Sequence, residues 1–145
     1  MPKRKPRRKL VGRFAKMWPR EAFDLLDNGK KLDLGITEEL GRPGVYVLYI
    51  NDEPYYIGKT AGSLFKRLHT HANKATSRYY NLWNFFSVFE ITNSAGRDEV
   101  EAILIAAMPT ANSSSPKFKP ITLPKTARVN LSRAKNLKYI RTKRL

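Results

Sequence analysis

The sequence predicts an α+β fold: a small three-stranded antiparallel sheet flanked by helices, with a basic extension at each end. Two short runs of strand-forming residues come first, and a helical pattern, a third strand-like run and a second helical pattern follow. This order does not alternate as parallel βαβ units do, so it favours an antiparallel sheet with helices on its faces. The length of 145 residues fits one domain.

The first two strands are predicted to form a hairpin. Residues 45–50 and 55–58 are rich in β-branched, aromatic and aliphatic side chains, and the turn-forming residues Asn51-Asp52-Glu53-Pro54 lie between them. Residues 85–91, with the sequence Phe-Phe-Ser-Val-Phe-Glu-Ile, have the composition of the third strand.

Two helices are predicted around the third strand. One runs from about Leu64 to Asn73 and places Leu64 and Leu68 in the core. The other runs from about Asp98 to Met108 and is ended by Pro109. Its predicted buried stripe consists of Val100, Ile103, Leu104 and Ala107.

The two ends of the chain have a different composition. Residues 1–12 are predicted to be a disordered basic arm, because they contain many Lys, Arg and Pro residues and little to bury. Pro19 suits a first helical turn and Gly29 a left-handed helix end, so residues 13–42 are predicted to be a helical extension. Residues 113–145 form a basic extension with a final helix predicted from Asn130 to about Thr142.

Charge separates these ends from the centre. Residues 1–20 carry nine Lys or Arg and residues 117–145 carry ten, with no acidic residue in either segment. Residues 21–116 carry nine basic residues and all twelve acidic ones. A nearly neutral domain between two basic arms is typical of a protein that neutralises phosphates of a polyanion.

Cysteine content and hydropathy exclude several classes of protein. The chain has no cysteine, which excludes disulfide scaffolds, cysteine-ligated metal sites and thiol nucleophiles. No window approaches the ~20 apolar residues of a membrane span, and no apolar run follows the first basic residues. We therefore expect an intracellular protein without membrane contact, in the cytoplasm or nucleoid, or in a eukaryotic nucleus.

Two triplets are the strongest local signal. Gly44-Val45-Tyr46 is followed ten residues later by Tyr56-Ile57-Gly58, and basic, acidic and amide residues follow at set positions. In this order and spacing, residues 43–112 resemble the GIY-YIG nuclease family, with Val45 in place of the Ile of the first triplet. The later residues that carry the resemblance are Lys59, Arg67, His71, Glu101 and Asn112.

The resemblance implies an endonuclease that hydrolyses phosphodiester bonds in DNA with one divalent metal, Mg²⁺ or Mn²⁺. It implies that Glu101 is the metal ligand and Arg67 the phosphate clamp, and that Tyr46 receives the proton of the attacking water. Tyr56 would be the second active-site phenol, and Lys59, His71 and Asn112 would be supporting groups. Glu99 is a rival for Glu101, but it lies about 200° around the same helix.

These residue types suit that chemistry. Mg²⁺ prefers oxygen ligands and commonly takes only one or two protein carboxylates, so Glu101 alone can hold it. A phenol has a pKa of about 10 and becomes a useful base only where positive charge lowers that pKa; Lys59, Arg67 and the metal could supply it.

The implied site places a condition on the hairpin. Tyr46 and Tyr56 must share one face of the sheet, and a four-residue loop would place Tyr49 there instead. We therefore predict a loop of odd length or a β-bulge.

Two other functions use the same fold. An RNA-cleaving nuclease or effector would share the chemistry and differ in its substrate. A catalytically inert nucleic-acid-binding protein would retain only the fold and the arms. The presence of every implied catalytic residue type argues against the inert binder. We rank DNA cleavage first, RNA cleavage second and inert binding third. No pattern identifies a dimer interface.

Overall fold

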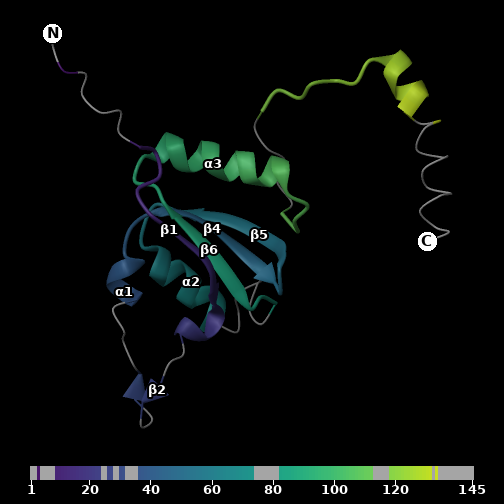
Figure 1. Cartoon of the computed structure of the whole chain (residues 1–145). Coiled ribbons are helices and arrows are strands. Elements are labelled where there is room, and N and C mark those ends of the chain that lie inside the picture. The colour runs from purple at the N-terminus through teal and green to yellow at the C-terminus, as the bar shows by residue number, and fades with distance from the viewer. Residues whose placement is uncertain are drawn as a thin grey trace.

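A four-stranded antiparallel sheet forms the centre of the computed structural model (Figure 1). The structure describes residues 3, 9–23, 26–27, 30–31, 36–73, 82–112, 118–131 and 133. The sheet has the strand order β1-β6-β4-β5. The strands are β1 (Phe14–Pro19), β4 (Gly44–Ile50), β5 (Glu53–Thr60) and β6 (Phe85–Glu90). The predicted fold class is confirmed, and β1 adds a strand that the sequence did not predict.

The predicted helical extension over residues 13–42 is wrong in its secondary structure. The segment contains β1, a 3-10 turn η1 (Arg20–Phe23), a small hairpin of β2 (Leu26–Asp27) and β3 (Lys30–Lys31), and the short helix α1 (Ile36–Glu39). The helix end predicted at Gly29 lies outside the described residues. β1 becomes a strand because β6 offers its edge, which is a tertiary effect that local propensity does not contain.

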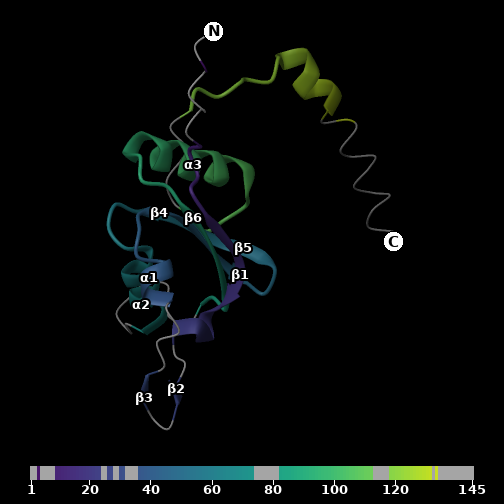
Figure 2. The same ribbon diagram turned by 60° about the vertical axis from the view of Figure 1, so that its left-hand side comes forward.

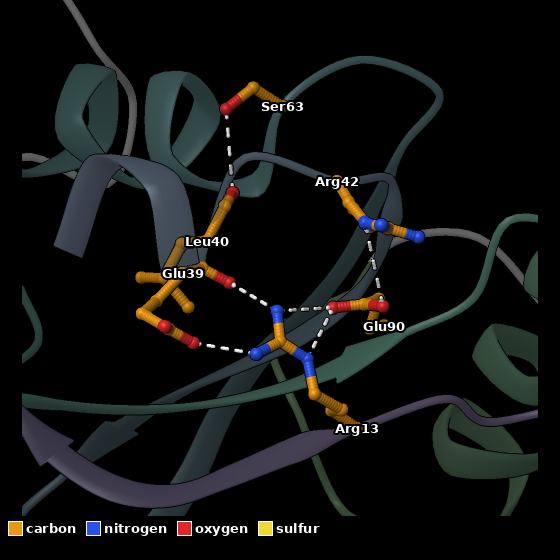
Figure 3. A network of polar contacts seen from close by, with 6 residues as sticks. All are labelled: Arg13, Glu39, Leu40, Arg42, Ser63 and Glu90. Atoms are coloured by element: carbon orange, nitrogen blue, oxygen red, sulfur yellow. Dashed lines mark hydrogen bonds and ion pairs between the residues drawn. The ribbon is translucent and has the colours of Figure 1, made fainter. Parts of the chain in front are cut away.

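Polar contacts fix the start of β1 against the rest of the sheet. Arg13 donates hydrogen bonds to the Glu39 carboxylate at 2.6 Å and to the Glu90 carboxylate at 3.0 and 3.1 Å (Figure 3). Arg42 approaches the same Glu90 carboxylate at 3.9 Å. Arg13 therefore joins β1, α1 and β6 in one network.

Helices cover both faces of the sheet (Figures 1 and 2). On one face α2 (Leu64–Asn73) packs its buried Leu64 and Leu68 against Tyr46, Leu48 and Phe86. On the other face α3 (Ser94–Ala107) packs against a second cluster that consists of Val45, Val47, Ile57 and Ile91. Successive residues of β4 and β5 therefore point to different helices.

The predicted bounds of α2 are confirmed, whereas α3 begins four residues before the predicted start. Asn93 caps α3 by accepting a hydrogen bond from the Gly96 N–H at 2.7 Å. The predicted buried stripe is partly wrong, because Ile103 is 50% exposed and Ala107 is also exposed. The residues of α3 that pack on the sheet are Val100, Leu104 and Ile105, with Met108 after its end.

The described residues 118–131 of the C-terminal extension lie apart from the sheet in both views (Figures 1 and 2). Residues 125–131 are helical, which is earlier than the predicted start at Asn130, and most of the predicted final helix lies outside the described residues. Within the described part of the chain, no helix has the length and apolar character needed to cross a membrane.

Candidate active site

A β-bulge brings the two tyrosines of the triplets to one face of the sheet. In the β4–β5 pairing Tyr46 lies opposite Gly58 and Leu48 opposite Tyr56, whereas Tyr49 pairs with Pro54. Tyr55 is thus an extra residue in β5, and the register shifts there. The centroids of the Tyr46 and Tyr56 rings are 6.2 Å apart. The predicted bulge is confirmed.

Gly58 makes room for the Tyr46 ring. A Cβ atom added at Gly58 would overlap Cζ and the hydroxyl oxygen of Tyr46. The glycine of the second triplet therefore permits the phenol of the first triplet to lie across β5, which is a close approach that only glycine allows.

Tyr46 and His71 form a buried hydrogen-bonded pair. The phenol oxygen lies 2.8 Å from Nε2 of His71, and the two side chains come from β4 and α2. Burial, and secondarily the positive charge of Arg67, lower the pKa of His71 to about 4. His71 is therefore neutral at neutral pH, and in the tautomer protonated at Nδ1 its Nε2 accepts a hydrogen bond from the phenol O–H.

Tyr46, which is expected to receive the proton of the attacking water, is fully buried. It is 0% exposed, and its phenol oxygen meets His71. Tyr56 is half-buried and its ring centroid lies 6.3 Å from that of His71. Solvent therefore reaches Tyr56 rather than Tyr46 in this conformation.

Arg67 lies on α2 one turn before His71. Its side chain is exposed, and its charge is close enough to act on the His71 pKa. Because residues i and i+4 of a helix share a face, the guanidinium lies on the side of α2 that carries the imidazole. This places a cation near the Tyr46–His71 pair.

Lys59 contacts two carboxylates of α3. Its Nζ lies 2.7 Å from Oδ1 of Asp98 and 3.4 Å from Oε1 of Glu101. The hydrogen bond to Asp98 and the nearby charge of Glu101 raise the pKa of Lys59, so its ammonium stays charged. Sequence reasoning predicted Lys59 and Glu101 but missed Asp98, whose signal is its position three residues before Glu101 on the same helix face.

The Glu101 side chain meets the requirements of a ligand for a hard divalent cation. It offers carboxylate oxygens and is 21% exposed. The Asp98 carboxylate contacts the same Lys59 ammonium. Mg²⁺ needs only one or two such ligands, because water and substrate phosphate complete its shell. The described residues contain no group of three or more His, Cys, Asp or Glu placed to hold a metal. A cation here would compete with the Lys59 ammonium.

Asn112 binds the backbone of β5. Its Oδ1 accepts from the Ile57 N–H at 3.0 Å, and its Nδ2 donates to the Ile57 carbonyl at 2.7 Å. The neighbouring Ala111 N–H donates to the Tyr55 carbonyl at 2.8 Å. The amide thus pairs with the edge strand as another strand would, directly beside Tyr56. These contacts hold Asn112 against β5.

Comparison with known proteins identifies this arrangement. A family model described as the GIY-YIG catalytic domain matches residues 42–108. The chain carries a GIY-YIG catalytic domain. The match confirms the expected family and the expected enzyme class, a GIY-YIG-type endonuclease.

Solved structures similar to the GIY-YIG domain include three point mutants of one protein. Each is the GIY-YIG N-terminal endonuclease domain of UvrC from Thermotoga maritima, bound to its catalytic divalent cation. Two are 24% identical to this chain and one is 23% identical, and each alignment covers 52% of this chain and 91% of that domain with a TM-score of 0.41. A search of curated proteins found no significant match.

Strand β5 is the common support of the groups in this GIY-YIG domain. Tyr56 carries the second phenol next to Tyr46 and His71, the backbone of Ile57 holds Asn112, and Lys59 meets Glu101. Tyr56 and Lys59 point to opposite faces because they are an odd number of residues apart in a strand. The structure therefore brings the phenols together with His71 on the α2 side, and Lys59 together with Glu101 on the α3 side.

Proposed function

We propose that this chain is a divalent-metal-dependent endonuclease that hydrolyses phosphodiester bonds in DNA. The observation that carries the proposal is the arrangement around β5, where a phenol–imidazole pair and a carboxylate–ammonium pair flank one short strand. The first can move a proton, and the second can bind a cation and a phosphate.

In this mechanism Tyr56 accepts the proton of the attacking water. Its half-buried position supports this role, because water can reach it, whereas the buried Tyr46 is hydrogen-bonded to His71. The Tyr46–His71 pair then lies behind Tyr56 and holds its ring in place. The positive charge of Arg67 on the same side favours the phenolate form of a tyrosine.

The cationic groups handle the charge of the phosphate. Arg67 offers a fork of donors that matches phosphate oxygens, and it would stabilise the charge that develops on the phosphorus centre. Glu101 would hold the metal, with Lys59 beside it as a second contact to phosphate. A bound divalent cation would polarise a phosphoryl oxygen and help to stabilise the leaving oxygen.

The basic extensions supply binding energy outside the site. Sixteen of the 28 Lys and Arg residues lie in residues 1–12 and 117–145. Asn112, bound to Ile57, fixes the point at which the C-terminal extension leaves the domain, and this point is next to Tyr56. Phosphate contacts by these arms would make DNA affinity fall steeply as salt rises.

The experiment is a cleavage assay on supercoiled plasmid and, separately, on structured RNA, with Mg²⁺ or Mn²⁺ and an EDTA control. We expect metal-dependent nicking or linearisation of plasmid by the wild-type chain and none by Glu101→Ala. Glu99→Ala is the matched control on the same helix and should cleave normally. Cleavage of RNA alone would favour the RNA nuclease.

A binding assay separates catalysis from the arms. Glu101→Ala, Tyr56→Phe and Tyr46→Phe should lose cleavage while salt-sensitive DNA binding stays nearly intact, and Arg67→Ala should lose cleavage with at most a small change in affinity. Salt-sensitive binding without cleavage of either polymer by the wild-type chain would favour the inert binder.

A further inference from the structure

We propose that Asp98 is a positioning residue for Lys59. It holds the Lys59 ammonium to one side of Glu101 and so keeps the Glu101 carboxylate available to a divalent cation. This inference rests on the proposed function, in which Glu101 is the metal ligand.

The distances rank the two partners of Lys59. The ammonium makes its hydrogen bond with Asp98, at 2.7 Å, and approaches Glu101 only to 3.4 Å. Asp98 and Glu101 are three residues apart on α3, so their side chains lie on one face. The Asp98 side chain is 63% exposed and that of Glu101 is 21% exposed. Asp98 thus holds the ammonium toward solvent, away from the more buried carboxylate.

Removal of the Asp98 charge would change which carboxylate the Lys59 ammonium contacts. Lys59 is fixed to β5, so its ammonium would turn to Glu101 as the remaining carboxylate partner on this face. That pair would be the stronger one, because Glu101 is less exposed and charges attract more where less water surrounds them. A divalent cation would then have to displace the ammonium before it could bind Glu101.

The charge of Asp98 could instead act on the cation directly, and Lys59 distinguishes the two routes. If Asp98 acts through Lys59, its removal has no effect in a chain that lacks the ammonium. If Asp98 attracts or ligates the cation itself, its removal weakens binding whether or not Lys59 is present. A double-mutant cycle on the two residues measures this difference.

The test is a titration of the full chain with Mn²⁺ alone, with the unbound ion measured by electron paramagnetic resonance. We expect Asp98→Asn to weaken Mn²⁺ binding by roughly five-fold or more. Asp98→Glu, which keeps a carboxylate within reach of Lys59, should restore most of the affinity. Glu99→Gln removes the same charge from the neighbouring position of the helix and should change the affinity less than two-fold. In the Lys59→Met chain, Asp98→Asn should have no further effect.

Two results would overturn the inference: unchanged Mn²⁺ affinity in Asp98→Asn, or an equal loss in the presence and absence of Lys59. The proposed function fails by a different result, in which Glu101→Gln binds Mn²⁺ as tightly as the wild-type chain or the wild-type chain binds none. The measurement does not depend on cleavage. Circular dichroism of each variant shows whether it is folded.

Discussion

The phenol oxygen of Tyr46 and Nε2 of His71 lie 2.8 Å apart within the core between the sheet and α2. This contact joins the first triplet to the helix that also carries Arg67. Both side chains are buried, so their hydrogen bond operates where water does not compete. The pair is part of the core as well as of the site, and its properties can be measured through stability.

The stability of the protein should fall as the pH decreases from about 6.5 toward 4. The pKa of His71 is lowered from 6.5 to about 4 in the folded chain, so in this window the unfolded chain binds a proton that the folded chain does not. Because one pKa unit corresponds to about 1.4 kcal/mol, the loss from this group reaches at most about 3 kcal/mol. Urea unfolding between pH 7 and pH 4 measures it.

A substitution of His71 separates its effect from that of the carboxylates that titrate in the same range. His71→Gln should show a shallower fall in stability between pH 6.5 and 4 than the wild-type chain. The same slope in His71→Gln and in the wild-type chain would contradict the lowered pKa.

Gly58→Ala should damage both stability and cleavage. The new methyl group would overlap the Tyr46 phenol, so the ring must move and its contact with His71 must change. Overpacking of this kind costs about 1–3 kcal/mol. Gly62→Ala is the control, since its nearest neighbour would be Thr60 Oγ1 at 3.8 Å. Equal unfolding midpoints for the two variants would show that the ring adapts without cost.

Asn112→Asp should be destabilising although the two side chains have nearly the same shape. The Nδ2 donor to the Ile57 carbonyl would be replaced by a carboxylate oxygen, so two acceptors would face each other. We expect a loss of about 1–3 kcal/mol in urea unfolding and faster amide exchange at Ile57.

The control for that change is Asn93→Asp. The Asn93 side chain acts only as an acceptor from the Gly96 N–H in the contact that caps α3, and Asp performs that role equally well. An Asn112→Asp chain as stable as Asn93→Asp would mean that the C-terminal segment does not depend on this pairing.

Arg13→Ala should loosen β1 more than it loosens the rest of the sheet. Arg13 is the donor to both Glu39 and Glu90, and the Glu90 backbone N–H binds the Arg13 carbonyl at 2.8 Å. Hydrogen exchange measured by mass spectrometry should accelerate over residues 12–19. Arg42→Ala, whose contact with Glu90 is 3.9 Å, should leave the exchange of these residues nearly unchanged. Equal protection in both variants would assign the docking of β1 to its backbone pairing alone.

The sequence predicted those parts of the fold that have a strong local pattern. The hairpin, the helix at Leu64–Asn73 and the strand that begins at Phe85 combine residue preference with periodicity, and the bulge at Tyr55 followed from the condition that Tyr46 and Tyr56 share a face. The family itself was predicted from the order and spacing of the two triplets and is confirmed.

The features that the sequence did not indicate depend on contacts between distant segments. β1 has an irregular pattern, with Met17 at a φ of 53° and a register shift between Ala15 and Trp18, so neither alternation nor propensity indicates it. The burial of Tyr46 follows from its packing under α2, which no property of the triplet contains. The sequence does not indicate the contact between Asp98 and Lys59, because the two residues are 39 positions apart.

β1 also means that the smallest piece of this protein able to fold extends beyond the matched catalytic residues 42–108. A fragment cut before Gly44 would lack β1 and leave the outer backbone groups of β6 without their partner strand. Such an uncovered edge is a template for pairing between molecules, so the truncated enzyme would tend to aggregate during expression. A shortened version made for crystallisation or for use as a nuclease module in fusion proteins should therefore begin before Leu10 and extend through Asn112.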